Sequence, residues 1–208
     1  MLQTNQLQFS YTGDQLLQFP DFTCQKGEQW LLLGQSGSGK TTLLHLLGGL
    51  LSPTEGTVKV GDTPLNQLSK AKLDQFRGKH IGIIFQQAHF VKSLTVSENL
   101  ELAQQLAGVP VNKKRISELL QRLNVGHKLH AKTNELSQGE QQRVAIARAL
   151  VNQPEVILAD EPTSALDDDN CEEVIQLLEE QAAAVGATLL VVTHDGRLKE
   201  RFEKRIEI

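Results

Sequence analysis

Residues 34–41 combine three glycines with a lysine and a threonine, in the pattern Gly-Gln-Ser-Gly-Ser-Gly-Lys-Thr, directly after an apolar run. Glycines let a backbone curl so that its N–H groups face phosphate oxygens, and the N-terminus of a following helix favours negative charge. In such a loop Lys40 reaches the β- and γ-phosphates of a nucleotide, and Thr41 places its hydroxyl on Mg²⁺. A glycine-rich turn without a ligand would explain neither the Lys-Thr pair nor three glycines. The loop therefore predicts a site for a nucleoside triphosphate and Mg²⁺.

Two adjacent acids, Asp160 and Glu161, follow the apolar run 156–159. Neighbouring carboxylates on a buried strand repel each other unless a cation is present. A metal beside Asp160 would resolve this repulsion and leave Glu161 to orient or deprotonate an attacking water. The alternative is that both acids cap a loop before Pro162, and the phosphate loop makes that interpretation less favourable.

A third polar group opens the segment LSQGEQQRVAIARAL at residues 136–150. Ser137 and Glu140 have the spacing of a capping box, in which each side chain accepts a hydrogen bond from the other residue's backbone N–H. Capping does not explain Gly139, which lowers helix propensity and exposes backbone N–H groups, as an anion site needs. The turn is therefore predicted both to cap a helix and to hold an anion.

Four buried strands must position these groups. Apolar runs alternate with helical patterns, which is typical of an α/β domain with a mainly parallel sheet. Each run ends in polar or glycine-rich residues, and open α/β sheets bind ligands beyond the carboxyl ends of their strands. The predicted strands are Trp30–Leu33, Ile81–Phe85, Val156–Ala159 and Thr188–Val192.

Two regions differ from this alternation. The alternating segment 2–10 and the extended segment 17–24 predict an antiparallel β subdomain beside the main sheet. Strand signals vanish between residues 87 and 150, and no linker rich in proline or glycine occurs there. We predict one domain over residues 1–208, with a catalytic core lobe (1–86 and 151–208) and a helical lobe (87–150). The helices expected in this lobe are Asn99–Leu106, Lys114–Leu123 and Glu140–Leu150.

The composition sets broad limits on the protein class. With 208 residues, 39% of them hydrophobic and 22% charged, the chain is long enough for one globular domain with an ample core. A net charge of −4 argues against a protein that grips nucleic acid, and we interpret the lysines around residues 70–79 as solvated surface. No apolar run approaches the roughly 20 residues that span a bilayer. The N-terminus does not resemble a signal peptide, and the two cysteines form no disulfide framework, so we expect a cytoplasmic location.

In order and spacing, a series of motifs resembles those of the ATP-binding subunits of ABC transporters, over essentially the whole chain. The resemblance implies a P-loop NTPase fold in which the helical lobe bears the family's signature turn, usually written LSGGQ. It implies that Tyr11 stacks on adenine and that Ser137 and Gly139 hold the γ-phosphate of an ATP bound by the opposite subunit. The loop implied to hold the phosphates is Gly34, Gln35, Ser36, Gly37, Ser38, Gly39, Lys40, Thr41 and Thr42.

The same resemblance assigns the remaining site residues. It implies that Thr41, Gln86 and Asp160 surround Mg²⁺, with Gln86 also sensing the attacking water. Glu161 is the implied catalytic residue that activates water, while Asp167 belongs to the family's D-loop and His194 lies near the γ-phosphate. Two other histidines, at 127 and 130, are spaced like neighbours on an exposed helix and are not predicted to bind metal.

The family also implies how the chain works. Two copies are expected to meet head to tail as an ATP-dependent homodimer that hydrolyses ATP and drives a separate membrane permease. The location would then be peripheral, on the cytoplasmic face of the inner membrane. The subgroup that the chain most resembles is the lipoprotein-releasing, macrolide-exporting and cell-division group. The alternative is a soluble ABC-type ATPase acting on DNA or ribosomes. Members of that class usually carry long insertions, which are not found here.

Two features of the sequence leave alternatives open. The signature turn departs from the family pattern with Gln138 and Glu140, and Glu140 brings a negative charge toward phosphate unless its capping role points it away. The segment 86–100 is where we expect the permease to bind, because Phe90, Val91 and Leu94 lie in a loop that no periodicity requires. The alternative is that these apolar residues pack under the helical lobe.

Overall fold

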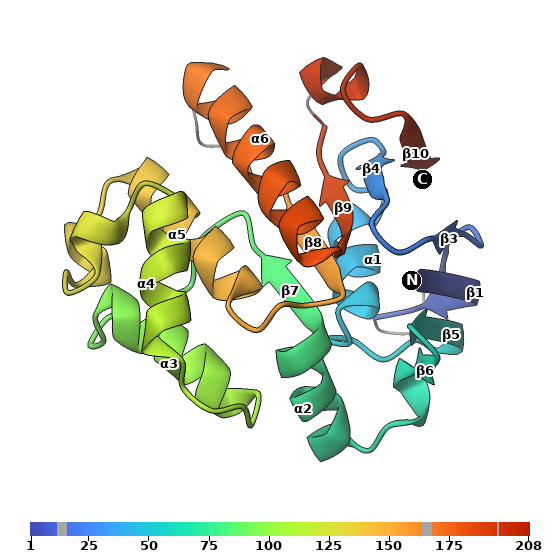
Figure 1. The fold of residues 1–208 in the computed structure, drawn as a ribbon. Coiled ribbons are helices and arrows are strands. Elements are labelled where there is room, and N and C mark those ends of the chain that lie inside the picture. Colours follow the sequence, from blue (N-terminus) through green and yellow to red (C-terminus); the bar gives the residue numbers. More distant parts are fainter. Residues whose placement is uncertain (12–15, 164–167, 195) are drawn as a thin grey trace.

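A five-stranded parallel sheet forms the centre of the described molecule. The computed structural model describes residues 1–11, 16–163, 168–194 and 196–208. Within these residues the strand order is β10-β4-β9-β8-β7, and every neighbouring pair is parallel (Figure 1). The strands are β4 (Gln29–Leu33), β7 (Ile81–Ile84), β8 (Val156–Asp160), β9 (Thr188–Val192) and β10 (Lys204–Glu207).

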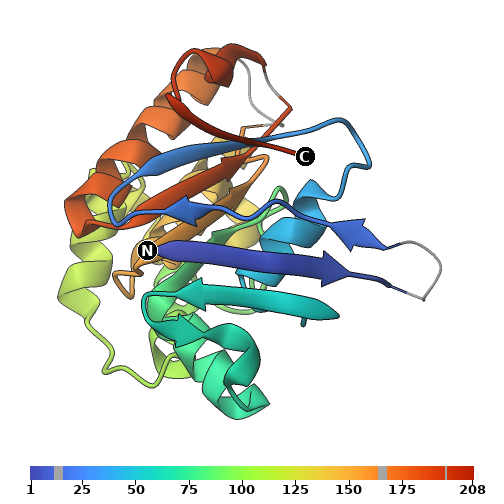
Figure 2. The same cartoon turned by 90° about the vertical axis from the view of Figure 1, so that its right-hand side faces the viewer.

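A second, antiparallel sheet lies beside the first, as the N-terminal pattern predicts. Its order is β2-β1-β5-β6, with β3 also paired to β1, and Figure 2 shows these strands in blue and teal on the face turned to the viewer. The expected extended segment 17–24 is two short strands with Pro20 between them, where the backbone lacks a donor N–H. The strands are β1 (Leu2–Phe9), β2 (Leu17–Gln18), β3 (Thr23–Cys24), β5 (Glu55–Val60) and β6 (Thr63–Pro64).

Strands β4, β7, β8 and β9 of the parallel sheet are covered on both faces, which is why they are apolar at nearly every position, whereas the edge strand β10 buries only Ile206. Leu190 and Val192 of β9 face a core that includes helix α1 (Lys40–Leu47) and the antiparallel sheet. Leu189 and Val191 face the opposite core, which includes α6 (Asp168–Val185). Helix α1 therefore lies between the two sheets, with its first turn at the carboxyl edge of β4 (Figure 1).

Helices occupy the chain between β7 and β8, as expected. They are α3 (Val96–Leu106), α4 (Lys113–Arg122) and α5 (Gln138–Leu150). The division of the chain into a core lobe and a helical lobe remains a prediction. Short 3₁₀ turns η2 (Gly126–Lys128) and η3 (Thr133–Glu135) connect α4 to α5. The prediction that His127 and His130 share a helix is wrong, because His127 lies in η2 and His130 in the turn that follows.

The remaining elements have weak sequence signals. The 3₁₀ turn η1 (Leu65–Gln67) and helix α2 (Lys70–His80) follow β6 in the chain and lead into β7. The 3₁₀ turn η4 (Gly196–Lys199) connects β9 to β10. Within the described residues no helix has the length and apolarity needed to cross a membrane. The strand order sets the carboxyl ends of β4, β9, β8 and β7 side by side, so the polar residues that follow these strands meet at one edge.

Candidate active site

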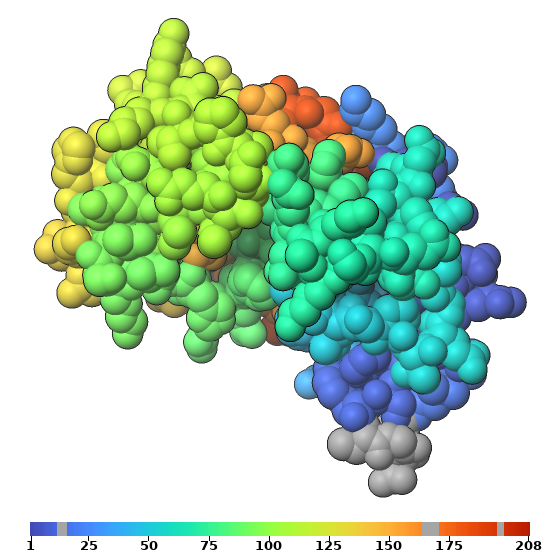
Figure 3. Space-filling model, turned by 90° about the horizontal axis from the view of Figure 1, so that it is seen from below, coloured from blue at the N-terminus to red at the C-terminus, as the bar shows by residue number. Residues whose placement is uncertain are grey.

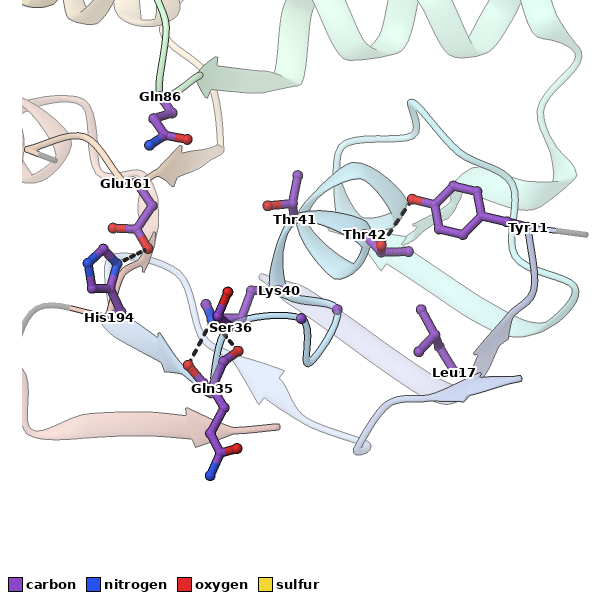
Figure 4. A pocket seen from close by; sticks show the side chains of 13 residues that line it. Tyr11, Leu17, Gln35, Ser36, Lys40, Thr41, Thr42, Gln86, Glu161 and His194 are labelled. Carbon is purple, nitrogen blue, oxygen red and sulfur yellow. Dashed lines mark hydrogen bonds and ion pairs between the residues drawn. The ribbon is translucent and has the colours of Figure 1, made fainter. Parts of the chain in front are cut away.

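A cavity of about 950 Å³ opens at this edge of the parallel sheet. Residues that follow β4, β7, β8 and β9 line it, together with side chains from the antiparallel sheet (Figure 4). Apart from Leu17, every lining residue was among the predicted site residues. The lining consists of Tyr11, Leu17, Gly34, Gln35, Ser36, Gly37, Gly39, Lys40, Thr41, Thr42, Gln86, Glu161 and His194.

The phosphate loop depends on glycine for local geometry. Gly39, which precedes α1, has φ +98°, a left-handed conformation that side chains disfavour. A Cβ on Gly34 would lie 2.5 Å from the carbonyl oxygen of Ile208, so no side chain fits there. The Lys40 ammonium donates to the carbonyls of Gly34 (2.7 Å) and Gln35 (2.8 Å), which fixes its charge over the loop. The buried Ser38 hydroxyl has no hydrogen-bond partner among the described residues, and a phosphate oxygen would supply one.

Asp160 does not line the cavity, but it is hydrogen-bonded to Thr41, which does, and together the two side chains fit a divalent cation. Asp160 is 6% exposed. Burial raises the pKa of its carboxyl, while a hydrogen bond from Thr41 opposes that shift. The neighbouring charge of Glu161 also raises this pKa, so a cation would relieve both burial and repulsion.

The donors present suit one metal in particular. No group of three or more His, Cys, Asp or Glu residues that could hold a metal occurs in the described ranges. Mg²⁺ needs no such group, since it usually takes one or two carboxylates and completes its shell with water and substrate phosphates. Asp160 with the Thr41 hydroxyl therefore fits Mg²⁺ that arrives with a nucleotide.

Glu161 is held on both carboxylate oxygens. One oxygen lies 2.7 Å from Nδ1 of His194, and the other accepts a hydrogen bond of 3.2 Å from the buried Thr193 hydroxyl. The backbone of Glu161 has φ +46°, and its N–H donates to the carbonyl of Val192 at 2.8 Å. A non-glycine residue keeps such a conformation only where its surroundings impose it. The strand end thus aims Glu161 into the cavity beside His194, as Figure 4 shows.

Tyr11 lies at the other end of the cavity, over the first turn of α1. Its ring is 63% exposed and packs edge-on against Phe9, with ring centroids 4.7 Å apart. Its hydroxyl is hydrogen-bonded to Oγ1 of Thr42 at 3.0 Å. An exposed, oriented aromatic face beside a phosphate loop is suited to stacking on a base.

The signature turn lies outside this cavity, since neither Ser137 nor Gly139 lines it. Both hydrogen bonds of the predicted capping box are present, from Ser137 N–H to Glu140 (2.8 Å) and from Glu140 N–H to Ser137 Oγ (3.3 Å). A Cβ on Gly139 would meet no atom within 4 Å, so the first turn of α5 presents an open surface. Asp167, the predicted D-loop residue, lies outside the described residues.

Sequence reasoning missed two residues that act on the predicted ones. Thr193 directly follows β9 (Thr188–Val192) and was given no role of its own, although its position one residue before His194 is a usable signal. Leu17 was assigned only to an extended segment, and its place in the cavity depends on the pairing of β2 with β1.

Comparison with known proteins identifies the family. Residues 17–164 match the model of the family described as ABC transporter. Over 214 residues the chain is 41% identical to the lipoprotein-releasing system ATP-binding protein LolD of Idiomarina loihiensis, covering 100% of this chain and 93% of LolD. It is 43% identical over 190 residues to the macrolide export ATP-binding/permease protein MacB of Bartonella quintana, covering 90% of this chain and 29% of MacB.

Solved structures share the whole fold. The ATP-binding cassette MJ0796, in a dimeric post-hydrolysis state bound to ADP and Pi, superposes with a TM-score of 0.89 at 36% identity. The alignment covers 100% of this chain and 94% of MJ0796. The fold is that of a P-loop NTPase, and the chain belongs to the ABC transporter family. It is an ATP-binding and ATP-hydrolysing subunit, and its relatives include the lipoprotein-releasing and macrolide-export proteins that the motifs predict.

Proposed function

We propose that the chain binds Mg²⁺ with ATP and works as an ATP-dependent homodimer on the cytoplasmic face of the membrane, beside a separate permease. The observation that carries this proposal is the composition of the cavity. It gathers the phosphate loop, Gln86, Glu161 and His194, yet the signature turn is not part of its lining. The Ser137 turn of a second copy would complete the site, and the solved cassette MJ0796 is dimeric.

Hydrolysis in this site rests on positioning and charge. Lys40 and the loop N–H groups bind the phosphates, and Glu161 aligns a water with the γ-phosphate and accepts its proton. His194 and Thr193 hold the Glu161 carboxylate, and Gln86 lies across the cavity from the phosphate loop (Figure 4). Mg²⁺, when held by Thr41 and Asp160, would neutralise negative charge on the phosphates.

Tyr11 is expected to contribute affinity through adenine. Tyr11→Ala should raise the Kd for ATP about tenfold, because stacking of a base on an aromatic ring contributes about 1–3 kcal/mol. Tyr11→Phe, which loses only the hydrogen bond to Thr42, should stay within about threefold. Calorimetric titration with ATP and with inorganic tripolyphosphate separates the effects. An equal loss for both ligands would contradict a role in adenine binding.

A groove of about 480 Å³ between α2, β7, α3 and α5 is the surface on which we place the permease. Figure 3 shows the molecule hollowed between the teal and green segments that contain α2 and α3. Leu106 (72% exposed) and Leu50 (40% exposed) lie in its lining. An apolar helix of a partner could therefore pack against exposed leucine side chains in this groove.

Phe90, where a contact with the permease was predicted, packs against the protein's own core. Phe90 is half-buried against the core, and the guanidinium of Arg148 lies 4.9 Å from its ring centroid, so it packs as the alternative interpretation expected. Arg148 lines the groove. Val91, the next residue of the predicted segment, is 44% exposed but does not line the groove. Phe90 therefore contacts a residue of the groove without lining the groove itself, so exposed groove residues are the better test of docking.

Leu106→Asp is expected to release the chain from membranes. When the chain is co-expressed with the membrane protein encoded beside its gene, the wild type should sediment with the membrane fraction. Leu106→Asp should lose about tenfold of that material, because the charge would be buried against an apolar partner. Val111→Asp is the matched control, since Val111 is an exposed apolar residue outside the groove lining. Retention of Leu106→Asp at the wild-type level would remove the groove from the proposal, and absence of the wild type from membranes would favour a soluble role.

A further inference from the structure

The signature turn carries a negative charge where the proposed dimer must accept a phosphate. Glu140 is in the first turn of α5, directly after Gly139, and like charges repel across a closed interface. The hydrogen bond from Ser137 N–H, assisted by the charge of Lys128, holds the pKa of Glu140 below its ordinary value, so the side chain is anionic. The anion needs a local partner if the turn is to bind a second anion.

Such a partner is present on a different element. The Glu140 oxygen that does not accept from Ser137 lies 3.4 Å from Nζ of Lys128 and 3.3 Å from Nε2 of His127. The Lys128 side chain is 29% exposed, whereas that of His127 is 63% exposed and is more strongly screened by solvent. Lys128 is therefore the principal counter-charge of Glu140.

Lys128 is held in place independently of α5. It ends η2, in which its N–H donates to the carbonyl of Val125 at 3.0 Å. The turn packs closely on α4, since a Cβ on Gly126 would lie 2.9 Å from Cγ of Gln121. The Lys128 ammonium thus reaches Glu140 from a backbone turn that is packed on α4. It attracts toward η2 the carboxylate oxygen that does not accept from Ser137.

We propose that Lys128 is a positioning residue of the shared ATP site, which neutralises Glu140 and keeps its carboxylate away from the nucleotide bound by the second copy. The inference rests on the proposed homodimer. The first-turn N–H groups at Gly139 then remain available to the phosphate. Without Lys128, the carboxylate and the phosphate compete for the same positive end of α5.

The test measures ATP-driven dimerisation in a background of Glu161→Gln, by light scattering. Lys128→Ala should weaken dimerisation about tenfold, from about threefold at each of the two shared sites, the order expected of partly exposed charge pairs. ATP binding to the monomer should not change. Lys128→Ala combined with Glu140→Gln should return to within about twofold of the background, because glutamine can still accept from Ser137 N–H without the charge. Lys128→Arg should behave as the background.

Rescue of Lys128→Ala by Glu140→Gln distinguishes a positioning role of Lys128 from a purely structural one. Lys114→Ala is the matched control, since Lys114 pairs with Glu118 at 3.9 Å on α4, away from the signature turn, and it should leave dimerisation unchanged. An unaltered Lys128→Ala, or a defect that Glu140→Gln does not relieve, would overturn the inference. Dimerisation of Ser137→Arg at the wild-type level would instead reject the shared site itself, so the two failures are distinct.

Discussion

Glu161→Gln is expected to lower the rate of ATP hydrolysis about 10²–10⁴-fold, the usual contribution of a general base, while the Kd for ATP stays within about twofold. The amide keeps an oxygen for the Thr193 hydroxyl but cannot accept the proton of water. Lys40→Ala should abolish both binding and turnover, because its ammonium acts on the phosphates in the ground state as well as in the transition state. Phosphate release and nucleotide titration, measured on the same preparations, separate these effects.

Glu155→Gln provides the control for Glu161→Gln. Glu155 also pairs with a histidine, His80, at 2.8 Å, but it precedes β8 instead of following it. Its loss should leave turnover unchanged within about twofold. Wild-type turnover in Glu161→Gln would refute the assignment of Glu161 as the residue that activates water.

Ser137→Arg should reduce turnover by more than about 100-fold while the monomer still binds ATP. A large cation at the open first turn of α5 would obstruct the second copy, and the lost cap itself costs only about 1 kcal/mol of stability. Asn112→Arg is a matched variant, because Asn112 caps α4 through a similar hydrogen bond of 2.9 Å from Arg115 N–H. It should lose similar stability and keep its activity.

Mixed dimers sharpen the Ser137 test. Subunits with Lys40→Ala and subunits with Ser137→Arg would together form one doubly altered site and one intact site. Activity in the mixture, where each variant alone is inactive, would require that sites are shared between chains. Turnover of Ser137→Arg at the wild-type rate would contradict a signature turn that completes the site.

Four strands of the parallel sheet, β4, β7, β8 and β9, could be predicted because they are covered on both faces and are therefore mainly apolar. Elements without a clear apolar pattern escaped prediction. Strand β10 buries Ile206 alone among its four residues, and α2 has no fully buried residue, so neither has an apolar pattern. Strand β5 begins with Glu55 and Gly56. Gly56 has φ +84°, and a glycine inside a short polar segment usually indicates a turn.

Some residues of the candidate site could be predicted from the sequence, and others could not. Residues in the segments that follow apolar strands, such as Lys40, Glu161 and His194, could be placed at one edge because parallel strands end together. The contact of Lys128 with Glu140 could not, because it depends on how η2 folds against α4. The position of Phe90 was left open for the same reason, since loop side chains are placed by tertiary packing and not by periodicity.

Strand β9 lies between β4 and β8, hydrogen-bonded to both, although it is the last of the three in the chain. Within the sheet, the strand that leads into the phosphate loop and the strand that ends in Asp160 are therefore joined through a segment that comes after both of them. A chain that has not yet inserted β9 has no assembled site, however well its earlier segments are ordered. Nucleotide that binds at this edge therefore stabilises the completed sheet by mass action.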